Sequence, residues 1–267
     1  MKVPAMVLAA SFAALPFSTA RAAILCTAFA DAATGKVLKQ DGACSKRMSP
    51  ASTFKIAIAL MGYDSGFLAD AHSPALPFRK GYPDWIASWK ATTDPTSWIR
   101  NSVVWYSQQV TQSLGEKRFQ RYAADFHYGN EDVSGDPGKH NGLTRAWLAS
   151  SLKISPLEQL EFLGKLVRRE LPVSGQAFEM TRKVTEIGML PNGWDIHGKT
   201  GAGVPKRPDG SPDRGRAFGW FVGWATKDGR TVVFARLVQD EKKEPVSPGL
   251  RTRDAMMHEL PALLGAL

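Results

Sequence analysis

Cysteines, histidines and long apolar runs are all scarce in this chain, and each scarcity excludes a class of protein. Two cysteines are too few for a zinc site with four cysteine ligands or for a scaffold of several disulfides. The five histidines are scattered, so no metal ligand cluster of adequate spacing is present and no metal is predicted. Beyond the N-terminal residues no segment approaches 18 uninterrupted apolar residues, so stable membrane insertion is not expected.

Acidic residues are also in deficit, which raises the question of a nucleic-acid partner. The chain has 34 Lys and Arg against 25 Asp and Glu, a formal net charge of +9. The basic residues are mostly scattered, and the densest group, Lys206-Arg207 with Arg214-Gly215-Arg216, has Asp209 and Asp213 interleaved. This pattern is more typical of a flexible loop than of a track for phosphates. No nucleic-acid partner is predicted.

Residues 1–22 have the features of a secretory signal peptide. Met1-Lys2 is a basic start, the stretch from Val3 to Phe17 is mainly apolar, and Ala20-Arg21-Ala22 is a small-x-small cleavage site. The apolar stretch is too short for a membrane span. Cleavage after Ala22 would leave residues 23–267 as an exported protein, with two positive charges fewer.

Export makes a disulfide between the two cysteines plausible on chemical grounds. The segment from Cys26 to Cys44 has the pattern of a β-hairpin whose turn is centred near Gly35. Cys26 and Cys44 are symmetric about this turn, so they would face each other across the open end of two antiparallel strands. We predict a Cys26–Cys44 disulfide; the alternative is two free buried thiols.

The order of elements predicts one α+β domain over residues 23–267. A hairpin is followed by an apolar helix from Ala51 to about Gly62, and residues 63–190 are predicted to form short helices and loops. One helix is well signalled by the capping box that begins at Ser155. Strands are expected at 194–200, 218–224 and 231–238, and a closing helix at 251–263. We expect one antiparallel sheet of N- and C-terminal strands, flanked by helices, with an all-helical region inserted.

A serine and a lysine three residues apart at the start of the apolar helix suggest nucleophilic catalysis. Ser52 and Lys55 would share a helix face, within reach of each other. A serine needs a base to take its proton, and a lysine is that base only when it is uncharged. The neighbouring residues carry no charge, so burial would lower the pKa of Lys55. The pattern is weak by itself, because Ser150 and Lys153 repeat the spacing.

A second motif, Lys199-Thr200-Gly201, favours Ser52 over Ser150. It lies on a predicted strand after Gly198, where small residues let a ligand approach the backbone closely. Only Ser52 combines a helix start, an apolar helix and such a strand far downstream. The stretch from Ser150 to Lys153 is more typical of a solvated segment before the Ser155 cap.

Together these motifs resemble a known family. The resemblance is carried by Ser49 to Ile56, Ser102-Val103-Val104, Tyr128-Gly129-Asn130, Trp147-Leu148, Lys199-Thr200-Gly201 and Phe218 to Trp224. In this order they are similar to the class D, oxacillin-hydrolysing, serine β-lactamases, and the middle motif has valine where class A enzymes and penicillin-binding proteins have asparagine. The resemblance implies the serine β-lactamase and penicillin-binding-protein fold, β-lactam substrates and a periplasmic location in a Gram-negative bacterium.

The resemblance also implies a role for each matching residue. Ser52 would be acylated, and Lys55 would be N6-carboxylated by carbon dioxide or bicarbonate, with no other cofactor. Trp147 would donate a hydrogen bond to this carbamate, and Val104 would keep its surroundings apolar. Ser102 would relay a proton to the leaving nitrogen. The alternatives are an ordinary core aromatic for Trp147, and a wall or a structural turn for Tyr128-Gly129-Asn130.

The substrate would be held by groups on the strand and on the closing helix. The backbone N–H groups of Ser52 and Ala202 would form the oxyanion hole. The substrate carboxylate would be bound by the remaining implied residues, Lys199, Thr200, Gly201 and Arg251. The alternative for Arg251 is a solvated arginine at a helix start.

Two other functions share the fold and the acylation step. A penicillin-binding transpeptidase or carboxypeptidase lacks fast deacylation, and the size of the chain, with no anchor or second domain expected, counts against it. A β-lactam sensor stays acylated and signals, and is expected to follow transmembrane segments, which the sequence does not predict.

Overall fold

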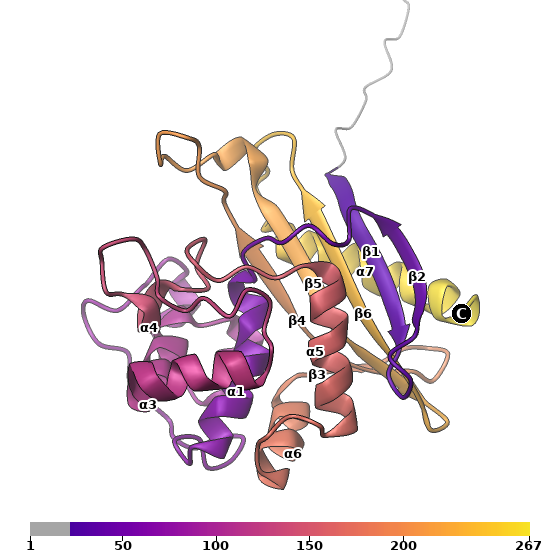
Figure 1. Ribbon diagram of the computed structural model, residues 1–267, viewed down its shortest axis with the longest axis horizontal. Coiled ribbons are helices and arrows are strands. Elements are labelled where there is room, and N and C mark those ends of the chain that lie inside the picture. Colours follow the sequence, from indigo (N-terminus) through magenta and orange to yellow (C-terminus); the bar gives the residue numbers. More distant parts are fainter. Residues whose placement is uncertain (1–21) are drawn as a thin grey trace, which may run out of the picture.

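A six-stranded antiparallel sheet in the order β2-β1-β6-β5-β4-β3 is the framework of the computed structural model, which describes residues 22–267 (Figure 1). The predicted signal peptide lies outside the described residues apart from Ala22. The strands are β1 (Ala23–Asp31), β2 (Val37–Gly42), β3 (Glu186–Met189), β4 (Asp195–Gly203), β5 (Phe218–Lys227) and β6 (Arg230–Gln239). Strands from both ends of the chain form this sheet, which confirms the predicted α+β fold.

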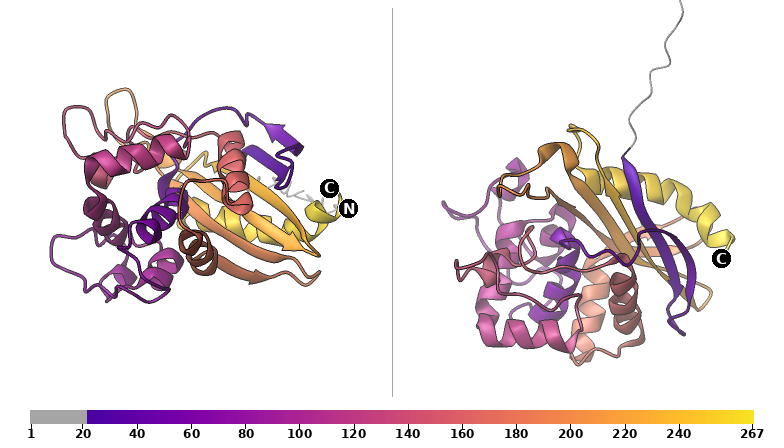
Figure 2. Two further views of the ribbon diagram at one scale, coloured as in Figure 1. Left: turned by 60° about the horizontal axis from the view of Figure 1, so that its bottom comes forward. Right: turned by 45° about the horizontal axis from the view of Figure 1, so that its top comes forward.

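The helices lie on both faces of the sheet, and most come from the middle of the chain (Figure 2). They are the 3₁₀ helices η1 (Ala51–Phe54), η2 (Ala87–Trp89) and η3 (Arg214–Arg216), and the α-helices α1 (Lys55–Asp64), α2 (Pro95–Asn101), α3 (Val104–Asp125), α4 (Gly142–Arg145), α5 (Pro156–Arg168), α6 (Gly175–Val184) and α7 (Pro248–Gly265). Within residues 22–267 no helix combines the length and apolar character needed to cross a bilayer.

The central strand β5 is buried on both faces, because helices cover both sides of it. Trp220 contributes to the core shared with α1 and α5, whereas the next residue, Phe221, packs in a second core beneath α7. Side chains alternate between the faces of a strand, so a run of large apolar residues fills both layers at once. Figure 1 shows α5 in front of the sheet and α7 behind it.

Two features of residues 63–190 differ from the prediction of short helices and loops. Residues 186–189 form the edge strand β3, in which Ile187 and Met189 are exposed, so no buried alternation marked it as a strand. Helix α3 spans 22 residues, although Gly115, at a φ of 71°, interrupts it. The Ser155 capping box forms as expected, since Ser155 Oγ accepts from the Glu158 N–H and the Glu158 carboxylate accepts from the Ser155 N–H.

The N-terminal hairpin and its disulfide confirm the prediction, with a change in register. Cys26 pairs with Gly42 across the strands, and Cys44 lies two residues beyond the end of β2. Gly42 has a φ of 89°, and a Cβ there would lie 2.3 Å from the carbonyl oxygen of Leu25. The chain therefore turns tightly back against β1, which brings the Cys26 and Cys44 Cα atoms to 5.1 Å for a disulfide.

We expect loss of this disulfide to destabilise the domain without changing its site. Replacing both cysteines by alanine should lower the free energy of unfolding by about 3 kcal/mol, because the unfolded chain regains the freedom of the closed loop. Urea denaturation of both proteins measures the difference, and wild type reduced with dithiothreitol is the control. Equal denaturation midpoints for the oxidised wild type and the double variant would contradict this expectation.

Candidate active site

Ser52 and Lys55 meet where η1 passes into α1. Lys55 Nζ lies 3.0 Å from Ser52 Oγ, within hydrogen-bond distance. Ser52 is half-buried, and the Lys55 side chain is completely buried. The residue before the serine, Ala51, has a φ of 49°, a left-handed conformation that is costly for a residue with a Cβ and is often found at functional sites. The structure thus brings the predicted nucleophile and its base together.

The burial of Lys55 changes its chemistry. Desolvation lowers the pKa of Lys55 well below the usual range, and the positive charge of Lys199 lowers it further. Its surroundings are apolar, because α1 is buried from Ile56 to Met61. A buried lysine without a carboxylate partner is stable only when it is uncharged. In its neutral form this amine could accept a proton from Ser52.

Strand β4 lies against the start of η1 with almost no space between them. A Cβ on Gly201 would lie 2.8 Å from the Pro50 carbonyl oxygen, and a Cβ on Gly249 of α7 would lie 2.4 Å from the Gly201 oxygen. The indole N–H of Trp220, paired with Gly201 in the sheet, donates to the Ser49 carbonyl at 3.0 Å. These contacts hold the backbone of the strand beside the helix that carries Ser52. The next residue, Ala202, lies on the same strand, and its role in the oxyanion hole stays a prediction.

Lys199 is the second buried lysine of the site. Its ammonium donates to the carbonyl and the hydroxyl oxygen of Thr200, each at 3.2 Å. Burial, together with the nearby charge of Arg253, lowers the pKa of Lys199 to about 7. An anion that reaches this ammonium would favour its charged form. Lys199 and Thr200 therefore offer a charge and a hydroxyl to an anionic group.

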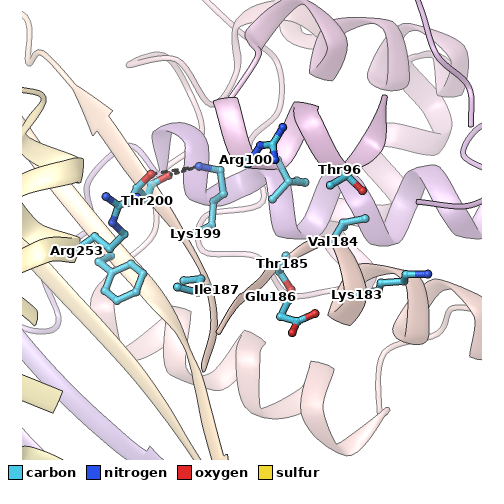
Figure 3. Close-up of a pocket in the computed structure, with 13 residues that line it drawn as sticks. Thr96, Arg100, Lys183, Val184, Thr185, Glu186, Ile187, Lys199, Thr200 and Arg253 are labelled. Atoms are coloured by element: carbon cyan, nitrogen blue, oxygen red, sulfur yellow. Dashed lines mark hydrogen bonds between the residues drawn. The ribbon is translucent and has the colours of Figure 1, made fainter. Parts of the chain in front are cut away.

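Ser102 and Val104 lie at the junction of α2 and α3. Ser102 ends α2 in a left-handed conformation with a φ of 57°. Val104 begins α3 and is buried in the main core. The end of α2, at Ile99 and Arg100, forms one wall of a cavity whose opposite wall includes Lys199 and Thr200 (Figure 3). Ser102 thus ends the helix whose last turn lines the cavity, although Ser102 itself is not part of the lining.

Trp147 lies beside the start of α1 with an unsatisfied donor. Its ring packs against Phe54, the residue before Lys55, with centroids 5.9 Å apart. The Ser49 hydroxyl donates to the Trp147 carbonyl at 2.8 Å, which ties this segment to η1. The indole Nε1 is buried and has no hydrogen-bond partner among the described residues. A buried N–H without an acceptor is costly, so this donor is suited to an acceptor that the polypeptide itself does not provide.

The Arg251 guanidinium is bound by neighbouring groups, and its contact with the substrate carboxylate stays a prediction. Its guanidinium forms two hydrogen bonds with the buried Asp240 carboxylate, at 2.7 and 2.8 Å, and donates to the Val246 carbonyl. Arg253 instead lines the cavity with Lys199 and Thr200. Arg253 faces the cavity because Gly249 lies against Gly201, and residues four positions apart on an α-helix lie on the same face.

The competing Ser150–Lys153 pair is part of a turn. Ser150 Oγ donates to Asp136 at 2.9 Å, and no helix aligns it with Lys153. The Lys153 carbonyl accepts from the Asn130 N–H at 2.9 Å, and the Asn130 side chain donates to the Ser151 carbonyl. A Cβ on Gly129 would lie 2.0 Å from the Lys153 oxygen. The Tyr128-Gly129-Asn130 motif therefore packs this turn tightly, which matches a structural role.

The cavity beside Lys199 has a volume of about 470 Å³ and lies between α2, α6, β3, β4 and α7 (Figure 3). Figure 3 shows Lys199 extending toward Thr200, with Arg253 on the same side and Arg100 on the facing wall. Within residues 22–267 no three histidine, cysteine or acidic side chains are grouped so that they could hold a metal ion. The polar side chains that line the cavity are hydroxyls, amines, guanidinium groups and the Glu186 carboxylate.

A buried Ser–Lys pair beside a Lys-Thr-Gly strand, at the junction of a helical region and an antiparallel sheet, defines a serine acyl-transfer enzyme of the penicillin-binding class. The comparison with protein families agrees, because residues 25–260 match the penicillin binding protein transpeptidase domain.

Comparison with individual proteins identifies the family within this class. The chain is 46% identical to β-lactamase OXA-9 of Klebsiella pneumoniae over 90% of this chain and 88% of that protein. It is 39% identical to β-lactamase OXA-1 of Escherichia coli over 78% and 74% of the two chains. The crystal structure of the OXA-427 class D β-lactamase superposes with a TM-score of 0.86, at 51% identity, over 90% of this chain and 98% of that one. The chain belongs to the class D serine β-lactamases and hydrolyses β-lactams.

We expect Gly201→Ala to slow acylation more than it destabilises the fold. The new Cβ would overlap the Pro50 carbonyl, so β4 and η1 must separate by several tenths of an ångström. Such a misplacement of Ser52 against the strand should lower the rate constant of acylation by about tenfold or more. The measurement is the pre-steady-state reaction with nitrocefin.

The matched control is Gly175→Ala, since a Cβ at Gly175 meets no atom within 4 Å. This variant should acylate as fast as the wild type. Wild-type acylation by Gly201→Ala would show that the close approach of β4 and η1 is not required.

The pKa of Lys199 predicts a pH-dependent stability. The folded-state pKa is about 7 against an ordinary value of 10.5, so between these values the unfolded chain binds more protons. The free energy of unfolding should therefore rise with pH across this window, by about 1 kcal/mol per pH unit from this group. In Lys199→Met the free energy of unfolding should rise with pH less steeply, by about 1 kcal/mol per pH unit. Urea denaturation of both proteins from pH 7 to 10 measures the two slopes.

The pKa of Lys55 shifts in the same direction, and its larger cause, burial, is kept in Lys199→Met. Lys36→Met, at an exposed position, is the control and should keep the wild-type slope. A Lys199→Met slope equal to that of the wild type would contradict the assignment.

Proposed function

We propose that this enzyme opens the β-lactam ring through an acyl-enzyme on Ser52, with Lys55, carboxylated on its amine, as the general base of both acylation and deacylation. The observation that carries the proposal is the 3.0 Å approach of Lys55 Nζ to Ser52 Oγ with the lysine completely buried. The Lys-Thr-Gly strand beside this pair supports the same reaction.

Acylation would proceed in three steps. Ser52 Oγ attacks the β-lactam carbonyl carbon as its proton moves to the Lys55 side chain. The negative charge that develops on the carbonyl oxygen is held by the backbone N–H groups of Ser52 and Ala202. The C–N bond of the ring then breaks as Ser102 relays the proton held by the Lys55 side chain to the leaving nitrogen. Ser102 gains one proton as it gives up another, Lys55 returns to its starting form, and an ester remains on Ser52.

The surroundings of Lys55 fit a carboxylated side chain. A lysine adds carbon dioxide only through its neutral amine, and burial keeps the pKa of Lys55 well below the usual range. The buried Trp147 Nε1–H lacks an acceptor, and a carbamate oxygen would provide one. When present, the carbamate supplies a stronger hydrogen-bonding base than the amine. Val104, buried in the same core, would exclude water from the lysine stem.

The substrate carboxylate would be bound by Lys199, Thr200 and Arg253. Lys199 and Thr200 present an ammonium and a hydroxyl, and Arg253 lies on the same side of the cavity (Figure 3). A guanidinium that offers two N–H groups to a carboxylate gives both charge and orientation. This set replaces the predicted one by exchanging Arg251 for Arg253.

We further propose that residues 1–22 direct export to the periplasm. The basic start, apolar stretch and Ala20-Arg21-Ala22 site support this, as does the Cys26–Cys44 disulfide, since such bonds persist in oxidising compartments. Finding the purified enzyme in the periplasmic fraction with Ala23 as its first residue would test it.

We expect bicarbonate to control turnover. Removal of carbon dioxide at low pH should lower nitrocefin hydrolysis by tenfold or more, and added bicarbonate should restore it. ¹³C-labelled bicarbonate should give a carbamate resonance in NMR that Lys55→Ala lacks. Trp147→Phe should weaken the resonance and slow deacylation more than acylation, since it removes the N–H donor and keeps an aromatic ring.

The outcomes separate three mechanisms. Full activity in Lys55→Ala, or a wild type without a carbamate resonance that still turns over, would contradict the proposed base. Stoichiometric acylation without turnover would indicate a penicillin-binding or sensor function instead. Phe54→Leu, a neighbouring core substitution, is the control for a purely structural effect of changing Trp147.

A further inference from the structure

The cavity beside Lys199 has more positive charge than one substrate carboxylate requires. Four basic residues line it, namely Arg100, Lys183, Lys199 and Arg253, against a single acidic one, Glu186. The walls between them are partly apolar, with Ile99, Val184, Ile187 and Phe221. An apolar cavity with an excess of one charge suits a group that has both a nonpolar body and a charge of the opposite sign.

Arg100 is the basic residue whose charge is not used by the groups described above. It lies in the last turn of α2, two residues before Ser102. Its side chain is exposed, and within residues 22–267 it forms neither an ion pair nor a side-chain hydrogen bond. Figure 3 shows it on the wall that faces Lys199, whereas Arg253 lies on the far side of Lys199 beside Thr200. Arg100 is thus free to meet a second anion.

The two other charged residues on the lining are placed differently. Lys183 and Glu186 are both exposed, on α6 and β3. In Figure 3 the Lys183 ammonium points away from Lys199, and the Glu186 carboxylate lies at the opposite end of the cavity from Arg100. The positive end of the cavity is therefore formed by Arg100, Lys199 and Arg253.

We propose that Arg100 forms a specificity subsite for an anionic substituent next to the carboxylate of the substrate. This rests on the proposed function, in which Lys199, Thr200 and Arg253 hold the carboxylate. In a cephalosporin the ring carbon beside the one bearing the carboxylate carries a variable side chain at C3. With the carboxylate on β4, this side chain is the part nearest the rest of the cavity. Its ring would contact the apolar wall, and a terminal sulfonate or carboxylate would pair with Arg100.

The test compares two cephalosporins that differ only in this charge. Cefonicid and cefamandole have the same side chain at C7 and the same thiomethyltetrazole at C3, but the tetrazole bears a sulfomethyl group in the first and a methyl group in the second. Because acylation expels this thiol, both leave the same acyl group on Ser52. The readout is the rate constant of acylation from intact-protein mass, taken as the ratio of cefonicid to cefamandole.

We expect Arg100→Gln to lower this ratio by about three- to fivefold, as for a solvent-exposed ion pair. Arg100→Lys should keep more of it, and 0.5 M salt should reduce the wild-type ratio because salt screens exposed charges. Lys183→Gln is the matched control, since it removes a charge of the same sign from the same lining, and it should change the ratio by less than twofold. Nitrocefin acylation should be unchanged in both variants.

An Arg100→Gln ratio equal to that of the wild type would overturn the proposal, as would an equal loss in Lys183→Gln, which would indicate a general field rather than this residue. The proposed function fails in a different way, through an acyl-enzyme that persists without turnover. In that case the acylation ratio can still be measured and still tests Arg100. Failure of either cephalosporin to acylate Ser52 while nitrocefin still does would overturn the subsite alone, whereas failure of nitrocefin as well would overturn the proposed function.

Discussion

The site depends on the cost of placing a lysine amine where water cannot reach it. Lys55 is completely buried, and within residues 22–267 it forms no ion pair with a carboxylate, so burial holds the pKa of its amine well below the usual range. That condition needs a helix whose every face is covered, which α1 obtains by lying between α3 and α6 and against the η1–β4 junction. Burial of the Lys55 amine lowers the free energy of unfolding, and the packing of the rest of the core must offset this loss.

A second constraint is the close contact of three backbones around Gly201. The strand lies between η1, where Pro50 precedes the nucleophile, and the start of α7, where Gly249 abuts it. Because no side chains separate these elements, the relative position of Ser52 and the strand N–H groups is fixed by backbone contact, which is stiffer than contact through rotatable side chains. The same packing turns Arg253, one helical turn after Gly249, toward Lys199. Fixed donors of this kind are what stabilise a developing oxyanion.

Predictions from the sequence were confirmed where all the residues on which they rest lie within one helix or one hairpin. The Ser52–Lys55 spacing, the Ser155 capping box and the hairpin around Gly35 all formed, since each depends on residues within a few positions of one another. The edge strand β3 was missed because its residues are largely exposed and it exists only through pairing with β4. Arg251 was predicted from the family resemblance, whereas the side of α7 that carries Arg253 to the cavity depends on how this helix packs against β4.

The sequence by itself determined the chemistry: a serine with a lysine one helical turn away, a Lys-Thr-Gly strand, and the family to which these motifs belong. Tertiary structure alone decided the electrostatics and the shape of the substrate site. Whether a lysine is neutral, whether the Trp147 N–H has an acceptor, and which arginine faces the cavity all depend on neighbours brought together from distant parts of the chain. Residue types specify which reactions are available, but burial and distance set the pKa values and contacts that make one of them proceed.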